Sequence, residues 1–215
     1  MAKVAAYIDG FNLYYGLLDD NPDLRWLDLE ALARALRPSD DLVKVRYCTA
    51  TVSALDDPQR PARQQAYLRS LRSLPLVEVT FGRFETREKT RRLVHPAPGQ
   101  NPEVRVYQTE EKGSDVNLAT HLILDGVEGL YEQAVVISND SDLEAPIREC
   151  NRRFGPVHIV SPYPFGPQYK NYSNDLRSAA ASYVALDPAL VGAAQLPDVV
   201  HLPNGKQVRR PDTWR

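Results

Sequence analysis

Residues 134–144 read Ala-Val-Val-Ile-Ser-Asn-Asp-Ser-Asp-Leu-Glu, and this stretch decides which fold the sequence predicts. Its first four residues are small or β-branched and apolar, a pattern typical of a buried parallel strand. The chain then turns polar at once, and the turn carries Asp140 and Asp142. A helical pattern follows from Leu143, and Pro146 suits the first turn of a helix, where N–H groups have no intrahelical partner. The sequence therefore predicts two carboxylates at the carboxyl end of a strand, where open α/β sheets bind ligands.

The short, mainly apolar run at residues 3–8 has the same form. It ends in Asp9, and Gly10 and Asn12 follow it closely. Glycine lets the chain turn sharply at this point. We therefore expect a carboxylate and an amide at the end of a second strand.

A third polar segment opens a helix. Residues 110–115 read Glu-Glu-Lys-Gly-Ser-Asp, and apolar residues recur after them at helical spacing. We expect Ser114 to be the N-cap of this helix and Asp115 to lie in its first turn, where the helix dipole favours an anion.

Together these segments supply four aspartates that would share one pocket if the three segments are neighbours. Carboxylates that close would repel one another and take up protons unless a cation held them. Oxygen ligands select hard cations, so the pattern predicts a site for Mg²⁺ or Mn²⁺. The candidate ligands are Asp9, Asp115, Asp140 and Asp142.

Three motifs, in this order, resemble those of the NYN domain, the LabA-like branch of the PIN-like nuclease superfamily. They are Tyr-Ile-Asp-Gly-Phe-Asn, Lys-Gly-Ser-Asp-Val-Asn-Leu-Ala and Ile-Ser-Asn-Asp-Ser-Asp-Leu, and the resemblance spans about residues 3–183. It implies a parallel sheet with helices on both faces and metal-dependent cleavage of RNA, as by an endoribonuclease. The metal-binding acids that it implies are Asp9, Asp115, Asp140 and Asp142, with Asn12 as a polar neighbour.

Strand-like and helical patterns alternate along the chain, which predicts an α/β fold: a three-layer, Rossmann-like or PIN-like parallel sheet with helices on both faces. The expected strands are residues 3–9, 42–52, 76–84, 134–137 and 157–160. The expected helices are residues 29–36, 58–74, a segment from 115, 143–154 and 175–184.

We expect one nuclease domain at residues 1–184 and a C-terminal extension at residues 185–215. The pair Asn204-Gly205 suggests a hairpin turn in the extension. Trp214 is expected to anchor the chain end on the domain itself or on the second copy of a homodimer, and an exposed disordered tail is the alternative.

A basic segment at residues 83–107 interrupts the alternation and reads as an inserted loop or hairpin. Its cations, Arg87 and Arg91 among them, could contact RNA phosphates, although a solvated loop is the alternative. Further candidates for substrate contact, some of which could instead shape the turn or the helix start, are Asn12, Lys112, Ser114, Ser138 and Asn139.

Composition sets the outer bounds of this interpretation. The chain has 215 residues, 43% of them hydrophobic and 25% charged, which suits a globular α/β domain with a modest appendage. Its net charge of −2 does not indicate a polyanion partner. A cluster of four acids would, however, offset the positive charge of a basic groove in this sum. No apolar run approaches transmembrane length and no signal peptide precedes the first strand, so we expect a cytoplasmic protein without a membrane partner.

Three other classes of protein compete with a nuclease. An aspartyl-phosphate phosphatase usually has a second acid two residues after its first, where this chain has Phe11. An oxidoreductase is suggested because some bacterial chains of similar layout are described as aromatic-ring hydroxylases, yet the 11 glycines never form a Gly-x-Gly. An RNA-binding module without turnover would keep the same pocket, and only an activity measurement separates it from an enzyme.

Overall fold

A six-stranded parallel sheet forms the centre of the computed structural model, which describes residues 1–54, 57–164 and 173–215. The strand order is β3-β2-β1-β6-β7-β8, and every neighbouring pair is parallel. In this order the strands are Val77–Phe81, Asp41–Thr49, Lys3–Asp9, Gln133–Ile137, Val157–Ser161 and Ser182–Ala185. The predicted α/β class with a parallel sheet is confirmed.

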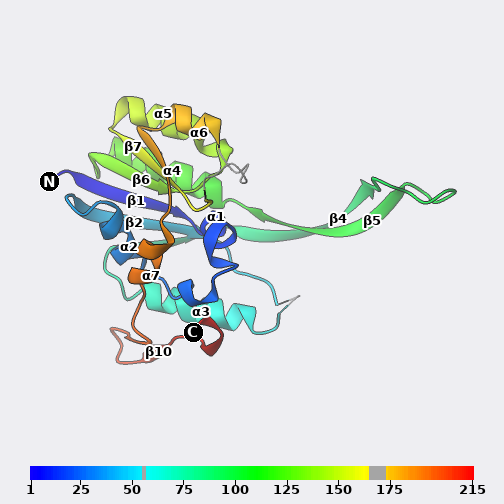
Figure 1. Cartoon of the computed structure of the whole chain (residues 1–215), viewed down its shortest axis with the longest axis horizontal. Helices are drawn as coiled ribbons and strands as arrows, with labels where there is room; N and C mark the ends of the chain where they lie inside the picture. The colour runs from blue at the N-terminus through cyan, green and yellow to red at the C-terminus, as the bar shows by residue number, and fades with distance from the viewer. Residues whose placement is uncertain (55–56, 165–172) are drawn as a thin grey trace.

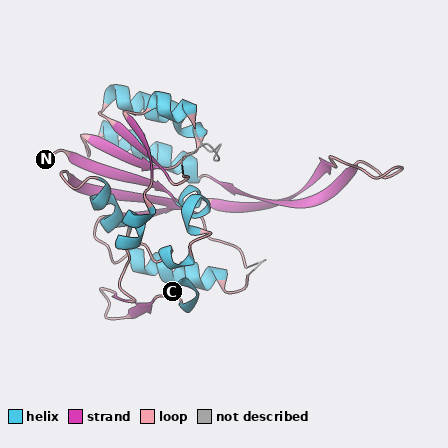
Figure 2. Ribbon diagram, viewed as in Figure 1, coloured by secondary structure: helices cyan, strands magenta, loops and turns pink. Residues whose placement is uncertain are grey.

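Helices cover both faces of the sheet, as the layers in Figures 1 and 2 show. On one face lie α4 (Ser114–Val127), α5 (Glu144–Arg153) and α6 (Asn174–Ala179); on the other lie α2 (Leu29–Leu36), α3 (Arg60–Leu71) and α7 (Pro188–Ala193). Each layer has its own apolar cluster, because successive β1 side chains point to opposite faces. Ile8 packs in the cluster of α2 and α3, whereas Tyr7 packs in the cluster of α4 and α5. None of the described helices is long and apolar enough to cross a bilayer.

A buried ionic network fixes α4 against the sheet. The Asp125 carboxylate accepts hydrogen bonds from Tyr7 Oη at 2.9 Å and from Arg46 Nη2 at 2.7 Å, so α4 is tied to β1 and β2 at once. Arg46 also pairs with the exposed Glu78 at 2.6 Å. The network holds the C-terminal half of α4, and thereby aims its N-terminus at the carboxyl edge of the sheet.

The segment at 83–107 belongs to a hairpin, which is one of the two forms that the sequence predicted. Strands β4 (Arg83–Arg92) and β5 (Glu103–Lys112) pair antiparallel over ten residues each. They form a separate two-stranded sheet that extends far from the body of the molecule (Figures 1 and 2). The hairpin returns to the body at Lys112, immediately before α4.

The C-terminal segment packs on the domain. Strands β9 (Val199–His201) and β10 (Gln207–Arg209) form the predicted hairpin around Asn204-Gly205, and Gly205 has a φ of 77°. Trp214, in the short helix η4 (Asp212–Trp214), lies with its ring centroid 6.2 Å from that of Trp26 and 6.1 Å from that of Tyr67. Trp214 therefore anchors the end on its own domain, which is one of the expected alternatives.

Two sequence predictions need correction. The helix predicted at residues 175–184 is wrong in its second half, because α6 ends at Ala179 and β8 forms a sixth strand at the sheet edge. An edge strand of four residues with an exposed Val184 lacks the buried apolar run that marks the inner strands. The strand predicted at 76–84 is really two, since β3 ends at Phe81 and β4 begins at Arg83.

The buried carboxylate of Asp125 offers a test of this packing. We expect Asp125→Ala to lower the free energy of unfolding by about 3 kcal/mol, because it leaves Arg46 and the Tyr7 hydroxyl without their buried partner. Glu78→Gln removes the exposed partner of the same arginine and should change the free energy by no more than about 1 kcal/mol. Equal losses in urea unfolding of the two variants would contradict the network as described.

Candidate functional site

Strands β1 and β6 end side by side at the carboxyl edge of the sheet, where Ile8 is opposite Ile137. Directly beyond this pair, Ser138 Oγ donates to Asp9 Oδ2 at 3.1 Å. One step further, the backbone N–H of Asn139 donates to Asn12 Oδ1 at 2.8 Å. The Asp9 segment and the turn after β6 therefore face each other, as the sequence interpretation required.

Asp9 is held firmly in this position. Its side chain is only 3% exposed, and Oδ1 accepts from the backbone N–H groups of Phe11 and Asn12 at the start of α1 (Gly10–Leu13). Gly10 is needed here, because a Cβ at this position would lie 2.9 Å from the Tyr47 ring and from the carbonyl oxygen of Cys48. The close approach of β2 thus explains why a glycine follows the aspartate.

Asp140 and Asp142 lie on the turn itself. Asp140 caps the short helix η3 (Ser141–Leu143), since its Oδ1 accepts from the Asp142 N–H at 2.9 Å. The Asp140 N–H in turn donates to Ser138 Oγ at 3.1 Å. Ser138 Oγ therefore bridges Asp9 and Asp140, and Asp140 is half-buried while Asp142 is exposed.

Asp115 enters the site from the first turn of α4, which contacts both β1 and η3. The predicted N-cap at Ser114 is wrong: Gly113 is the cap, in a left-handed conformation with φ 100° that favours glycine. Ser114 is buried, and its N–H and hydroxyl both donate to Glu111 Oε1, at 3.1 and 2.7 Å. A carboxylate at the end of β5 thus does the capping that the sequence assigned to a serine.

The pKa values of Asp9 and Asp115 are raised by burial and by the charges of neighbouring acids. Burial raises the pKa of Asp9 to about 6, the Asp140 charge adds to the rise, and hydrogen bonds from Asn12 and Ser138 oppose it. Burial also raises the pKa of Asp115 to about 7, and the charges of Asp9, Asp140, Glu111 and Asp142 raise it further. Within the described chain, no basic side chain is among the main causes of either shift. The result is a region of poorly compensated negative charge at the carboxyl edge of the sheet, and such strongly shifted groups mark candidate functional sites.

The donor chemistry of this pocket fits a hard divalent cation. Its side chains offer carboxylate and amide oxygens, the ligands that Mg²⁺ and Mn²⁺ prefer. In the part of the chain that the structure describes, no three His, Cys, Asp or Glu side chains are already arranged as a metal site. Mg²⁺ commonly uses one or two carboxylates and keeps several waters, so a pair of carboxylates suffices for the fit.

The other predicted contact residues divide into two groups. Ser114 and Ser138 are buried and hydrogen-bonded within the site, and Asn139 Oδ1 accepts from the Tyr183 hydroxyl at 2.5 Å, so these three side chains stabilise its frame. Lys112 is exposed and pairs with Glu110 Oε2 at 3.0 Å, at the base of the hairpin.

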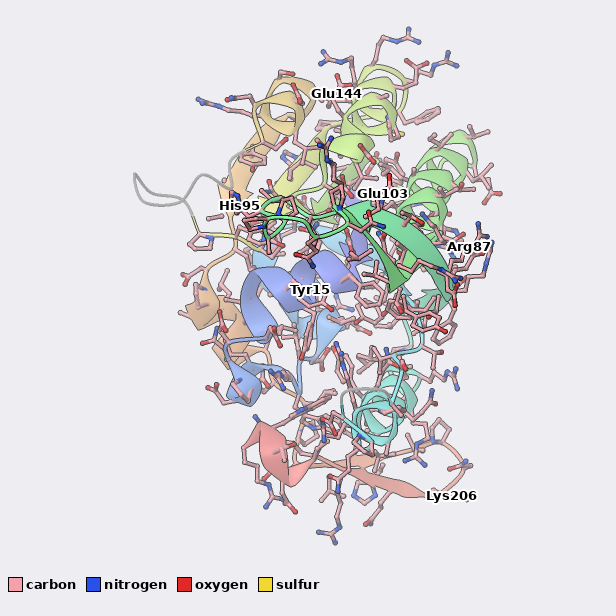
Figure 3. The ribbon with its side chains drawn as sticks, turned by 90° about the vertical axis from the view of Figure 1, so that its right-hand side faces the viewer. Tyr15, Arg87, His95, Glu103, Glu144 and Lys206 are labelled. Atoms are coloured by element: carbon pink, nitrogen blue, oxygen red, sulfur yellow. The ribbon has the colours of Figure 1, made fainter. Side chains whose placement is uncertain are left out.

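Arg87 and Arg91 are not brought to the acids. Both are on β4, and Figure 3 shows Arg87 on the projecting hairpin. Arg91 is eight residues beyond Arg83, which at about 3.4 Å per residue corresponds to about 27 Å along the strand. Arg87 pairs with Glu85 at 2.7 Å and Arg91 donates to Gln108, so both are surface residues of the hairpin.

Two residues at the site escaped the sequence interpretation. Glu111 could have been suspected, because it is an acid four residues before Asp115 and adjacent to the motif. Tyr183 gave no local signal, since it belongs to the unpredicted strand β8. Its contact with Asn139 depends on the strand order, which places β8 next to β7.

Comparison with known proteins agrees with this architecture. The sequence is 29% identical to the 6-hydroxy-3-succinoylpyridine 3-monooxygenase HspA of Pseudomonas putida over 239 residues, covering 99% of this chain and 75% of that protein. The crystal structure of a Vibrio parahaemolyticus protein of unknown function superposes with a TM-score of 0.51 at 18% identity, covering 86% of this chain and 93% of that one. At that identity the likeness shows the fold alone.

The family itself is shown by a match along most of the sequence. The sequence model of the NYN domain matches residues 3–187, which include the four predicted aspartates and every strand of the central sheet. That range also includes the hairpin of β4 and β5. This chain therefore belongs to the NYN domain family.

Proposed function

We propose that this protein is a metal-dependent ribonuclease, an endoribonuclease that hydrolyses phosphodiester bonds at the four-aspartate pocket. The NYN domain is a nuclease-type domain. The observation that carries the proposal is the convergence of Asp9, Asp115 and Asp140, from three distant segments, in one uncompensated electrostatic field. Mg²⁺ or Mn²⁺ is the proposed cofactor, RNA the proposed substrate and the cytoplasm the proposed location.

In this proposal each acid has its own task. Asp9 and Asp140 would hold the ion directly, because Ser138 Oγ fixes both at the junction of β1 and β6. Asp115 and Asp142 would accept hydrogen bonds from the water molecules around it, or would hold a second ion. When bound, the ion would lower the pKa of a water molecule and neutralise charge that grows on the phosphate. No side-chain nucleophile is needed.

The remaining predicted residues would act on the substrate or on the frame. Asn12, Ser138 and Asn139 fix the turn that carries Asp140, and Ser114 fixes the start of α4. Lys112 lies at the hairpin base, where it could reach a phosphate near the pocket. Arg87 and Arg91 would contact phosphates far from the cleaved bond, because the hairpin carries them away from the acids.

A second candidate function comes from the relative that is named a monooxygenase. That protein is named for its action on 6-hydroxy-3-succinoylpyridine, and the two proteins align over almost the whole of this chain. Against this candidate, the sequence has no Gly-x-Gly with which to bind a dinucleotide. NADH consumption by the purified protein with a hydroxypyridine would favour the second candidate. Binding of RNA without cleavage would favour a non-catalytic module.

The assignment of Asp140 is tested by removing its charge. We expect Asp140→Asn to lower the rate of RNA cleavage in Mg²⁺ by about 100-fold or more, because a direct ligand and its charge are lost. Glu144→Gln is the matched control: it changes the acid at the first position of α5, whose ion pair in the described part of the chain is with Arg148 on the helix surface. Cleavage of structured and single-stranded RNA by all three proteins would be compared, and equal rates would refute the role of Asp140.

The crowded acids also predict how stability depends on pH. An unfolded aspartate has a pKa near 3.9, whereas in the folded protein the values are about 6 for Asp9 and about 7 for Asp115. Between about pH 4 and pH 7 the folded state therefore binds more protons than the unfolded state. The free energy of unfolding falls as the pH rises through this range, so these acids stabilise the fold least above pH 7. We expect the metal-free wild type to lose more stability between pH 5 and pH 8 than Asp115→Asn does.

Added Mn²⁺ or Mg²⁺ should reverse this loss. At pH 8 an ion at 100 times its dissociation constant would raise the free energy of unfolding by about 2.7 kcal/mol, and at pH 5 protons would compete with it. Thermal melts of wild type and Asp115→Asn, with and without the ion, measure both effects. Identical pH profiles of the two proteins, or no metal effect at pH 8, would count against the pocket as a cation site.

A further inference from the structure

A second pocket, with a volume of about 400 Å³, lies beside the acids on the α3 side of the sheet. Its size is within the range of small-molecule sites. Aromatic rings form much of its wall: Phe11, Tyr14, Tyr15, Tyr47, Tyr67 and Trp214. Tyr15 is 55% exposed, and in the view of Figure 3 it lies between the hairpin and α3. The pocket thus offers ring surfaces that are open to a ligand.

Three arginines also line this pocket, and one of them lacks an acidic partner. Arg25 pairs with Asp19 at 3.5 Å, and Arg63 pairs with Asp57. Arg60 makes no ion pair with any described carboxylate, and its guanidinium lies 5.8 Å from the centre of the Tyr14 ring. The balance of charges in the wall is therefore positive, opposite to that of the acid pocket.

The N-terminus of α3 carries cations, whereas the helix dipole favours anions there. Arg60 and Arg63 are in the first turn of the 12-residue helix α3, which has no acidic residue there and no side-chain cap. The positive end of the helix dipole repels both cations. Local rules are commonly broken in this way at functional sites, where a ligand supplies what is missing. The Arg60 guanidinium hydrogen-bonds the Tyr15 side chain but has no described acidic partner, so an anion beside it would supply that partner and would also face the helix N-terminus.

The two pockets share a border. Gly10 and Phe11 line the aromatic pocket and directly follow Asp9. On the neighbouring strand β2, Tyr47 and Thr49 also line the aromatic pocket. They lie on either side of Cys48, which pairs with Asp9 in the sheet. Because the Asp140 turn lies beyond β6, on the other side of Asp9, a ligand in the aromatic pocket would approach the acids from the β2 side.

We propose that this aromatic pocket binds a planar heteroaromatic ring that carries an anionic group. The ring would stack on the exposed tyrosine surface, where base–aromatic contacts tolerate different rings. The anion would take a charge-assisted hydrogen bond from Arg60 at the N-terminus of α3. Two sources have this chemistry: a nucleotide unit of RNA, with its phosphate, and a small heteroaromatic carboxylic acid. The inference does not depend on turnover, so it stands or falls separately from the ribonuclease proposal.

Binding of defined probes to the full-length chain tests the chemistry. The probes are adenosine 5′-monophosphate, adenosine, inorganic phosphate and nicotinate, titrated by calorimetry and by the fluorescence of the 2 tryptophans, one of which lines the pocket. We expect a probe with both ring and anion to bind at least about tenfold more tightly than adenosine or phosphate. Tight binding of the nucleotide identifies RNA as the source, and tight binding of nicotinate alone identifies a small acid. Failure of both to bind would overturn the proposal.

Two arginines on the same helix provide the matched variants. Arg60→Gln should weaken binding by about tenfold or more, without loss of thermal stability, because it also removes a cation from the helix N-terminus. Arg69→Gln removes the same charge in the last turn of α3, outside the pocket, and should bind as the wild type does. Equal affinities of the two variants would refute the role of Arg60. Asp140→Asn should not weaken binding, which separates this result from any failure of the ribonuclease proposal.

Discussion

One hydroxyl, Ser138 Oγ, joins the parts of the site. It donates to Asp9 at the end of β1 and accepts from the Asp140 N–H after β6, so the geometry of both acids follows from their neighbouring strands. The parallel order β2-β1-β6 is the condition for this contact, since parallel strands end at the same edge. Asp115 joins them because the Asp125 network fixes α4 across β1 and β2. The pocket is therefore a direct consequence of the sheet topology.

Charge is distributed unevenly along this edge. Crowded carboxylates lie where β1 and β6 end, whereas arginines and aromatic rings lie where β1 and β2 end, on the side of α3. A cation held by the first group and an anion held by the second would be adjacent, with Asp9 at the border. Such a pair of sites suits a phosphodiester in the proposed ribonuclease. One fold can host unrelated chemistries, so the site has to be tested directly.

Much of this arrangement could be predicted from local patterns. Buried apolar runs followed by oxygen-rich turns located β1 and β6, and the alternation of strands and helices predicted the parallel sheet. The edge strand β8 could not be found, because four half-exposed residues carry no distinctive periodicity. Ser114 was misjudged as a cap because its own N–H and hydroxyl donate to the carboxylate of Glu111, three residues earlier. From the sequence, Tyr14 and Tyr15 could be proposed to stack a base, but the rest of the aromatic pocket could not be predicted, because Arg60 and Trp214 join them only through tertiary packing.

Crystals grown with Mn²⁺ provide the most direct measurement of the central claim, that one divalent ion binds where β1 and β6 end. The anomalous scattering of manganese locates the ion without any assumption about activity. The account predicts a peak between the carboxylates of Asp9 and Asp140, with Asp115 and Asp142 around it, and no such peak in Asp140→Asn. A well-occupied peak elsewhere on the chain, or none at saturating Mn²⁺, would contradict it.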